Sequence, residues 1–134
     1  MNQVLVDSNV LLDVLTEGPT WFDWSESALG ACAEHSVLSI NPIIYAEVAS
    51  GFRRKEDLDA ALPPERFHPE ALPWDGAFLA GKSFVQYRRR GGERRSPLPD
   101  FYIGAHAAVA GMTLLTRDAA RYRTYFPKLQ ILAA

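Results

Sequence analysis

Short apolar runs alternate along the chain with stretches whose apolar residues recur at helical spacing. The apolar runs predict strands at residues 3–6, 37–40, 113–115 and 129–132, and a weaker strand at 66–72 that Pro69 would confine to a sheet edge. Helical periodicity predicts helices at 9–15, 20–35, 42–52, 55–62, 75–90, 99–111 and 119–125. Because strands that alternate with helices are joined by right-handed crossovers, we expect an α/β fold with a parallel sheet.

Composition places the chain among ordinary globular proteins. Its 134 residues are 48% hydrophobic and 22% charged, which excludes a disordered chain and predicts a single domain over residues 1–134. The lone cysteine, Cys32, cannot form an intramolecular disulfide and is typical of a reducing cytosol. Asp7 interrupts the apolar run near the start, and no segment has the length of a membrane span. We therefore expect a cytoplasmic protein without membrane attachment.

Four acidic residues stand near the points where a strand or loop passes into a helix. Asp7 ends the run at 4–6, Asp118 follows the run at 112–117, Asp100 follows a proline, and Glu47 lies in the helix that begins at Pro42. In open parallel sheets, ligands bind beyond the carboxyl ends of the strands, where we expect these acids to meet. Carboxylates that converge must be neutralised, and their hard oxygen atoms favour Mg²⁺ or Mn²⁺.

Each acid also has a purely structural interpretation. Asp7 and Asp118 suit turns or helix N-caps, and Asp100 suits a helix N-terminus because its charge complements the helix dipole. Glu47 lies beside the apolar stripe of its helix, where a carboxylate needs a partner. Four further acids are expected on solvated helix faces, namely Asp13, Asp23, Glu26 and Glu34.

Basic charge is concentrated in one segment. The net charge of −2 argues against non-specific coating of nucleic acid, yet five of the 14 basic residues fall between positions 88 and 95. They flank Gly91 and Gly92 and are Arg88, Arg89, Arg90, Arg94 and Arg95. This cluster is either a solvated helix end whose cations suit the helix dipole or a surface that binds phosphates.

Residues 76–83 satisfy the G-x-x-x-x-G-K-[ST] pattern of a phosphate-binding loop. The intervening residues are apolar and favour a helix, and only the weak strand at 66–72 precedes them. We therefore predict a helix rather than a nucleotide site.

The histidines and the aromatic residues near position 21 are expected to be structural. His35, His68 and His106 lack zinc-ligand spacing. The aromatic group Trp21, Phe22 and Trp24 is expected to pack a helix onto the core, with a partner-binding surface as the alternative.

Four segments taken in order, residues 4–12, 42–47, 99–107 and 114–118, resemble the PIN domain, and within it the VapC-like ribonuclease toxins of prokaryotic toxin–antitoxin pairs. The resemblance covers nearly the whole chain. It implies a three-layer α/β/α domain with strand order 3-2-1-4-5. It also implies a set of acidic metal ligands (Asp7, Glu47, Asp100 and Asp118), with the hydroxyls of Ser8 and Thr116 as polar supports. Gly104 and His106 depart from the family's usual residues in the third segment.

The resemblance further implies a Mg²⁺- or Mn²⁺-dependent endoribonuclease that hydrolyses RNA phosphodiester bonds, the toxin of a type II toxin–antitoxin system. The cations that grip RNA phosphates would come from the Arg88–Arg95 cluster together with Arg53, Arg54 and Arg117. A homodimer and a small VapB-like antitoxin are the expected partners. The alternative from a different functional class is a catalytically silent PIN-like module that binds RNA or protein.

Overall fold

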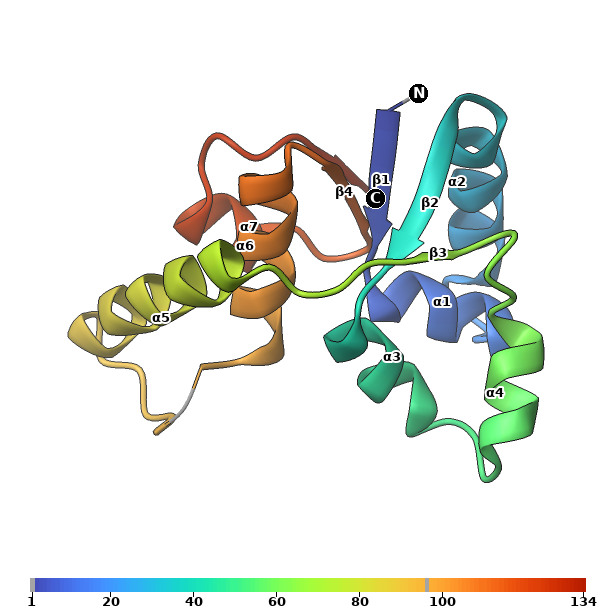
Figure 1. Ribbon diagram of the computed structural model, residues 1–134, viewed down its shortest axis with the longest axis horizontal. Helices are drawn as coiled ribbons and strands as arrows, with labels where there is room; N and C mark the ends of the chain where they lie inside the picture. Colours follow the sequence, from blue (N-terminus) through green and yellow to red (C-terminus); the bar gives the residue numbers. More distant parts are fainter. Residues whose placement is uncertain (1, 96) are drawn as a thin grey trace.

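The computed structural model describes residues 2–95 and 97–134 and contains a parallel sheet in the order β3-β2-β1-β4-β5 (Figure 1). The strands are β1 (Asn2–Val6), β2 (Ser36–Ile40), β3 (His68–Pro69), β4 (Thr113–Thr116) and β5 (Ile131–Ala133). The helices are α1 (Ser8–Leu15), α2 (Phe22–His35), α3 (Pro42–Ala49), α4 (Lys55–Ala61), α5 (Trp74–Arg89), α6 (Pro99–Ala110) and α7 (Ala120–Tyr125). The predicted fold class and strand order are confirmed.

β1 is the central strand, and the strand order reverses beside it. The chain proceeds from β1 to β2 and β3 on one side and then returns to place β4 on the other. Val6 lies opposite Leu115, and the backbone N–H of Asp7 donates to the Leu115 carbonyl at 2.8 Å. The end of β1 is therefore held against the end of β4 at the switch point, where α/β sheets bind their ligands.

Helices lie on both sides of the sheet, and the carboxyl ends of the strands lie between the two groups of helices. In Figure 1, α2 lies to the right of β1 and β2, α1 and α3 lie below the lower ends of these strands with α4 at the lower right, and α5, α6 and α7 lie to the left. The carboxyl ends of β1 and β2 point toward the lower edge of this view. Residues 4–6 are at most 3% exposed, as expected for a strand that helices bury on both faces.

The largest differences in extent from the prediction are in two elements. Helix α3 ends at Ala49 rather than at residue 52, because the N–H and hydroxyl of Ser50 both donate back to the Glu47 carbonyl and the next two N–H groups also bond three residues back. The weak strand shortens to the two residues of β3, whose Pro69 lies at the sheet edge as predicted.

The apparent phosphate-binding loop lies inside α5, as predicted. Gly76 packs against α6, where an added Cβ would lie 3.4 Å from the His106 Cα. The Ser83 hydroxyl donates to the Leu79 carbonyl at 3.0 Å, and the Lys82 ammonium lies over the Phe78 ring. The motif residues therefore serve helix packing. None of the helices in residues 2–95 and 97–134 has the length and apolar character needed to cross a membrane.

We predict that Lys82→Ala changes the free energy of unfolding by less than about 1 kcal/mol, because it removes only an exposed cation–π contact. ATP, with or without Mg²⁺, should leave the melting temperature unchanged. Specific binding at a hundred times the Kd would add about 2.7 kcal/mol of stability, which thermal unfolding detects easily. Such a gain in the wild type, lost in Lys82→Ala, would restore the nucleotide interpretation.

Candidate functional site

Four carboxylates that are far apart in sequence line one pocket at the carboxyl edge of the sheet. The cavity has a volume of about 400 Å³. Its lining residues come from the ends of β1 and β4 and from the starts or inner faces of nearby helices, and they are Asp7, Ser8, Asn9, Glu47, Asp100, Asp118, Ala120 and Arg121. All four acids singled out from the sequence are present. Among the described lining residues, Arg121 is the only basic one.

Asp7 is buried at the end of β1 and accepts several hydrogen bonds. One carboxylate oxygen, Oδ1, accepts from the Ser8 N–H at 2.8 Å, so Asp7 also caps α1. The other, Oδ2, accepts from the Thr116 hydroxyl at 2.8 Å and from the Tyr122 hydroxyl at 2.8 Å. The cap is thus only part of what holds this side chain, because hydroxyls from two other elements, β4 and α7, bind its second oxygen.

Glu47 reaches the pocket from α3 and is half-buried. Its Oε1 accepts a hydrogen bond from the Ser8 hydroxyl at 2.9 Å. The same Ser8 hydroxyl lies 3.4 Å from Asp7 Oδ1. Ser8 therefore links a carboxylate of α3 to the end of β1. This hydroxyl is the partner that a carboxylate beside an apolar helix face requires.

Asp100 lies in the first turn of α6 and faces α7. Its Oδ1 lies 3.3 Å from the Tyr122 hydroxyl, and its Oδ2 accepts from Arg121 Nη1 at 3.3 Å. Both partners are side chains of α7, whereas a capping role would require backbone N–H groups. The geometry therefore departs from the capping interpretation of Asp100.

Asp118 is exposed and follows β4. Its Oδ1 accepts from the Ala120 N–H at 3.3 Å, and its own N–H donates to the Thr116 hydroxyl oxygen at 3.2 Å. Asp118 thus both lines the pocket and supports the start of α7.

Tyr122 was not singled out from the sequence, although it contacts two of the four acids. A lone tyrosine in an amphipathic segment is typical of a core residue, and Tyr122 is only 1% exposed. Burial raises the pKa of the Tyr122 phenol well above its usual value, and the charges of Asp7 and Asp100 raise it further. The phenol therefore stays protonated and acts as a donor.

Negative charge is disfavoured in this pocket. Burial raises the pKa of Asp7, and the nearby Asp100 charge adds to this, against the opposing effect of the Thr116 and Tyr122 hydrogen bonds. Burial also raises the pKa of Glu47, with Asp7 and Asp100 contributing and the Ser8 hydrogen bond opposing. A cation bound among these carboxylates would relieve both effects.

The donor set fits a hard divalent cation. Carboxylate oxygens are the ligands that Mg²⁺ and Mn²⁺ prefer. Within the described part of the chain, no three acidic, histidine or cysteine side chains already converge as a finished metal cage. Because Mg²⁺ keeps several waters and needs only one or two carboxylates, such a cage is not required. Asp7 and Asp100, which share one hydroxyl, are the best-placed pair.

A partly buried ion pair holds the loop that carries Asp118. Arg117 forms a fork with Asp13, with Nε at 2.9 Å from Oδ2 and Nη2 at 3.1 Å from Oδ1, and its guanidinium lies over the Trp21 ring. The Ser25 hydroxyl of α2 also donates to Asp13 at 2.8 Å. The expectation that Asp13 lies on a solvated face is therefore wrong. Asp13 is buried, and its ion pair with Arg117 offsets the cost of burying its charge. Arg117 itself is committed to this contact rather than free for RNA.

His106 is a core residue, as expected for a lone histidine. The side-chain amide nitrogen of Asn41 donates to His106 Nδ1 at 3.0 Å. The side-chain oxygen of Asn41, Oδ1, caps α3 by accepting from the Ile44 N–H. Burial lowers the pKa of His106, which is consistent with a neutral ring that accepts at Nδ1. His106 therefore ties α6 to the start of α3, the helix that carries Glu47.

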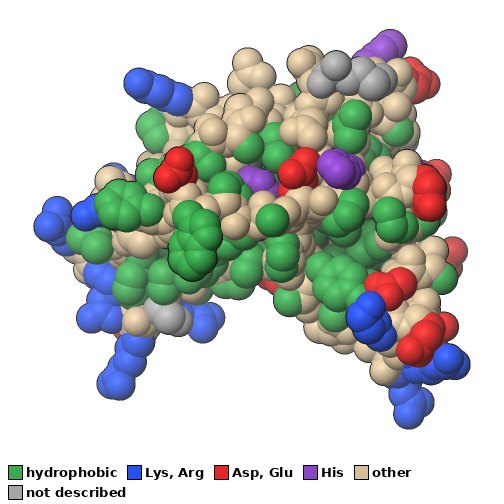
Figure 2. Space-filling view, viewed as in Figure 1, with side chains coloured by type: hydrophobic (Ala, Val, Ile, Leu, Met, Phe, Trp, Pro, Cys, Tyr) green, Lys and Arg blue, Asp and Glu red, His purple; other side chains and the backbone are tan. Residues whose placement is uncertain are grey.

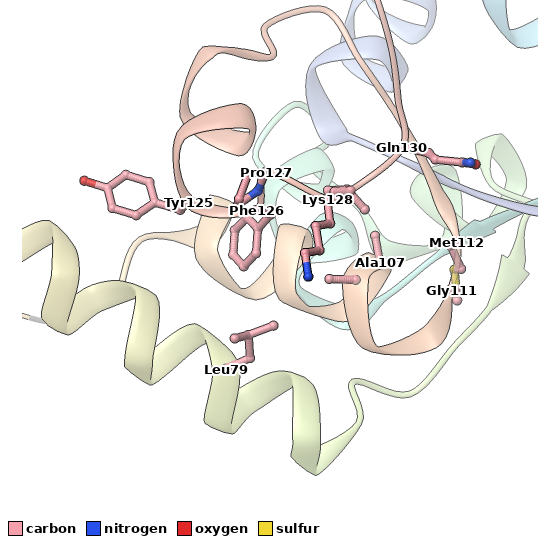
Figure 3. Close-up of a pocket in the computed structure, with 11 residues that line it drawn as sticks. Leu79, Ala107, Gly111, Met112, Tyr125, Phe126, Pro127, Lys128 and Gln130 are labelled. Atoms are coloured by element: carbon pink, nitrogen blue, oxygen red, sulfur yellow. The ribbon is translucent and has the colours of Figure 1, made fainter.

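A larger cavity of about 510 Å³ lies elsewhere, between α5, α6 and the segment before β5 (Figure 3). Its walls are mainly apolar and include Leu79, Ala107 and Phe126, and no acidic side chain is among its described lining residues. Figure 3 shows the Tyr125 side chain pointing away from the other residues of this cavity. The carboxylate pocket is therefore the candidate site for chemistry.

Comparison with known proteins identifies the family. The PIN domain sequence profile matches residues 4–127, and the chain belongs to the PIN domain family. A search of curated proteins found no significant match.

Solved structures share the fold over nearly the whole chain. VapBC2 from Rickettsia felis bound to a DNA fragment from their promoter has a TM-score of 0.75 at 19% identity and covers 98% of each chain. VapBC-1 from nontypeable Haemophilus influenzae has a TM-score of 0.73 at 18% identity, covering 98% of this chain and 97% of that one. FitAcB from Neisseria gonorrhoeae has a TM-score of 0.67 at 20% identity and covers 96% of each chain. The resemblance inferred from the sequence is confirmed.

We predict that Asp13→Ala lowers the free energy of unfolding by about 2–3 kcal/mol. This lies between the loss of an exposed ion pair and that of a fully buried one, because the Arg117 side chain is 32% exposed. Urea unfolding measures the change. Glu26→Ala, which removes an exposed carboxylate from α2, is the control and should cost at most about 0.5 kcal/mol. Equal losses of stability from the two substitutions would contradict the stabilising role given to the Asp13–Arg117 ion pair.

Proposed function

We propose that this protein is a Mg²⁺- or Mn²⁺-dependent endoribonuclease that acts as the toxin of a toxin–antitoxin pair in the cytoplasm. The observation that carries the proposal is the single pocket lined by Asp7, Glu47, Asp100 and Asp118, with Arg121 as its one described basic residue. Membership of the PIN domain family and the VapBC-like fold support the same activity.

In this proposal, Asp7 and Asp100 would hold the cation, and Glu47 and Asp118, which line the same pocket, would contribute further oxygen atoms. A bound cation would activate water for attack on a scissile phosphate and neutralise charge on the leaving oxygen. Thr116 and Ser8 keep Asp7 and Glu47 in place through hydroxyl donors at 2.8 and 2.9 Å. Because these hydroxyls already donate to carboxylates, neither is proposed as a nucleophile.

RNA would be gripped by basic residues on both sides of the carboxyl edge. Figure 2 shows Lys and Arg side chains gathered at the lower left of this face, over the end of α5 and the following loop, and at the lower right, near α4. The lower-left group corresponds to the Arg88–Arg95 cluster, where Arg88 Nη1 donates to the Arg94 carbonyl and joins the helix end to the loop. Arg53 and Arg54, both exposed, directly precede α4. Phosphates contacted on both sides would cross the acidic pocket between them.

Partners are proposed by analogy with solved structures that share the fold, one of which is described as a toxin–antitoxin complex from Klebsiella pneumoniae. We expect a small VapB-like antitoxin that covers the pocket. A homodimer is also proposed, and α5 offers apolar side chains for such an interface, since Trp74 is 88% exposed and Phe78 is 68% exposed. Figure 2 shows this apolar group over α5.

Cleavage of a panel of structured and single-stranded RNAs tests the function. With Mg²⁺ or Mn²⁺, we expect cleavage that leaves 5′-phosphate and 3′-hydroxyl ends, and EDTA should abolish it. RNA binding without cleavage under any metal condition would favour the catalytically silent binding module. Equal cleavage in EDTA would remove the metal from the mechanism.

We predict that Asp100→Asn abolishes metal-dependent cleavage while the metal-free fold keeps or gains stability. Asn retains an oxygen but lacks the charge that a cation requires, and it removes a charge that raises the pKa values of Asp7 and Glu47. Differential scanning fluorimetry in EDTA measures the melting temperature. Asp75→Asn, at an exposed position in the first turn of α5, is the control and should remain active. An active Asp100→Asn protein with wild-type metal dependence would exclude Asp100 from the site.

We predict that replacing Arg88, Arg89 and Arg90 by Gln weakens RNA binding and flattens its salt dependence by about 0.7–1 unit of log–log slope per lost phosphate contact. Binding is measured in EDTA so that no RNA is cleaved. A control triple variant at Arg66, Lys82 and Lys128 removes the same charge elsewhere and should change the slope less. Equal slopes in both variants would favour the interpretation of the cluster as a solvated helix end without an RNA-binding role.

A further inference from the structure

We propose that Tyr122 is a positioning residue of the carboxylate pocket, and that Gly104 provides the space that lets its hydroxyl reach Asp7 and Asp100. The inference rests on the proposed function and deepens it. Its basis is a contact between α7, α6 and the end of β1 that involves only residues of this chain.

The Tyr122 hydroxyl joins two carboxylates that would otherwise repel each other. It lies 2.8 Å from Asp7 Oδ2 and 3.3 Å from Asp100 Oδ1. A protonated phenol has one hydrogen to donate, so the shorter contact with Asp7 takes it and the longer one leaves Asp100 weakly bound. Arg121, the next residue along α7, donates to the other oxygen of Asp100 at 3.3 Å. Two adjacent residues of α7 therefore set where both carboxylates lie.

The ring of Tyr122 is held so firmly that the hydroxyl has little freedom. The side chain is 1% exposed and belongs to the hydrophobic core with Phe126. The phenol is fixed at its buried end by packing and at its polar end by Asp7. A donor locked in this way keeps its acceptors in one geometry, which is the usual role of a group that supports metal ligands.

Gly104 makes this arrangement possible. It lies one helical turn after Asp100 on α6, and a Cβ added there would lie 2.4 Å from Phe126 Cε2 and 3.0 Å from Tyr122 Cδ1. Any side chain at position 104 would push α7 away from α6 and withdraw the phenol from the carboxylates. The glycine at this position is thus explained by the rings of Tyr122, in α7, and Phe126, directly after α7, which pack on it.

Tyr122→Phe tests the proposal because it keeps the ring and removes only the hydroxyl. We measure Mn²⁺ affinity of the metal-free protein by electron paramagnetic resonance without RNA, and kcat and KM for RNA at saturating Mn²⁺. We expect Mn²⁺ affinity to fall by about tenfold or more, as for other groups that orient metal ligands, with KM for RNA unchanged. Tyr125→Phe is the matched control, since it removes a hydroxyl from the same helix while keeping a ring that packs on Phe101 and Arg90.

The possible outcomes separate this inference from the proposed function. Wild-type Mn²⁺ affinity in Tyr122→Phe, with wild-type kcat, would overturn the inference alone. An equal loss in Tyr122→Phe and Tyr125→Phe would overturn it as well, because the effect would then be general to α7. No Mn²⁺ binding by the wild type would overturn the proposed function and this inference together.

Gly104→Ala provides a second variant that leaves every polar group of the pocket in place. We expect it to weaken Mn²⁺ binding, and Gly104→Ala combined with Phe126→Leu to recover part of the loss by relieving the closest contact. A Gly104→Ala protein that folds and binds Mn²⁺ like the wild type would contradict the role given to Gly104.

Discussion

The buried carboxylate of Asp7 is the constraint on which the rest of the site depends. It ends the central strand, is 3% exposed, and must remain compatible with a core built from the apolar residues directly before it. Burying a carboxylate without partners would be costly, and this protein supplies an N–H from α1, a hydroxyl from β4 and a hydroxyl from α7. These bonds draw three elements to one point. They do not fully offset the effect of burial, so the pKa of Asp7 still lies above its usual value.

The surrounding polar groups form a layer that holds the other acids around Asp7. Ser8 joins it to Glu47, Thr116 joins it to the loop of Asp118, and Tyr122 joins it to Asp100. Behind this layer, the Asp13–Arg117 pair fixes the β4–α7 loop and His106 fixes α6 against α3. The carboxylates are thus kept close despite their repulsion. Such an arrangement is stable only if a cation or protons compensate the charge, which is the physical basis for proposing a metal site.

Much of the fold was predictable because its signals are local. Apolar runs of strand length marked four of the five strands, and the acids at their ends marked the carboxyl edge of the sheet. The contacts missed from the sequence join residues with no shared local pattern. Tyr122 and Asp7 are 115 positions apart, and Arg117 and Asp13 are 104 apart. Gly104 was visible as a departure from the family pattern, but the rings that require it, those of Tyr122 and Phe126, lie in and directly after another helix. The acid positions could therefore be inferred, whereas the groups that hold them required the structure.

The central claim is that the pocket bounded by Asp7, Glu47, Asp100 and Asp118 binds a divalent cation. The most direct test is an anomalous difference map from crystals of the wild-type protein soaked in Mn²⁺, with crystals soaked in Ca²⁺-free EDTA buffer as the reference. The account predicts an anomalous peak inside this pocket, about 2.0–2.4 Å from carboxylate oxygens of Asp7 and Asp100. Strong Mn²⁺ peaks elsewhere on the molecule, with none in this pocket, would contradict it.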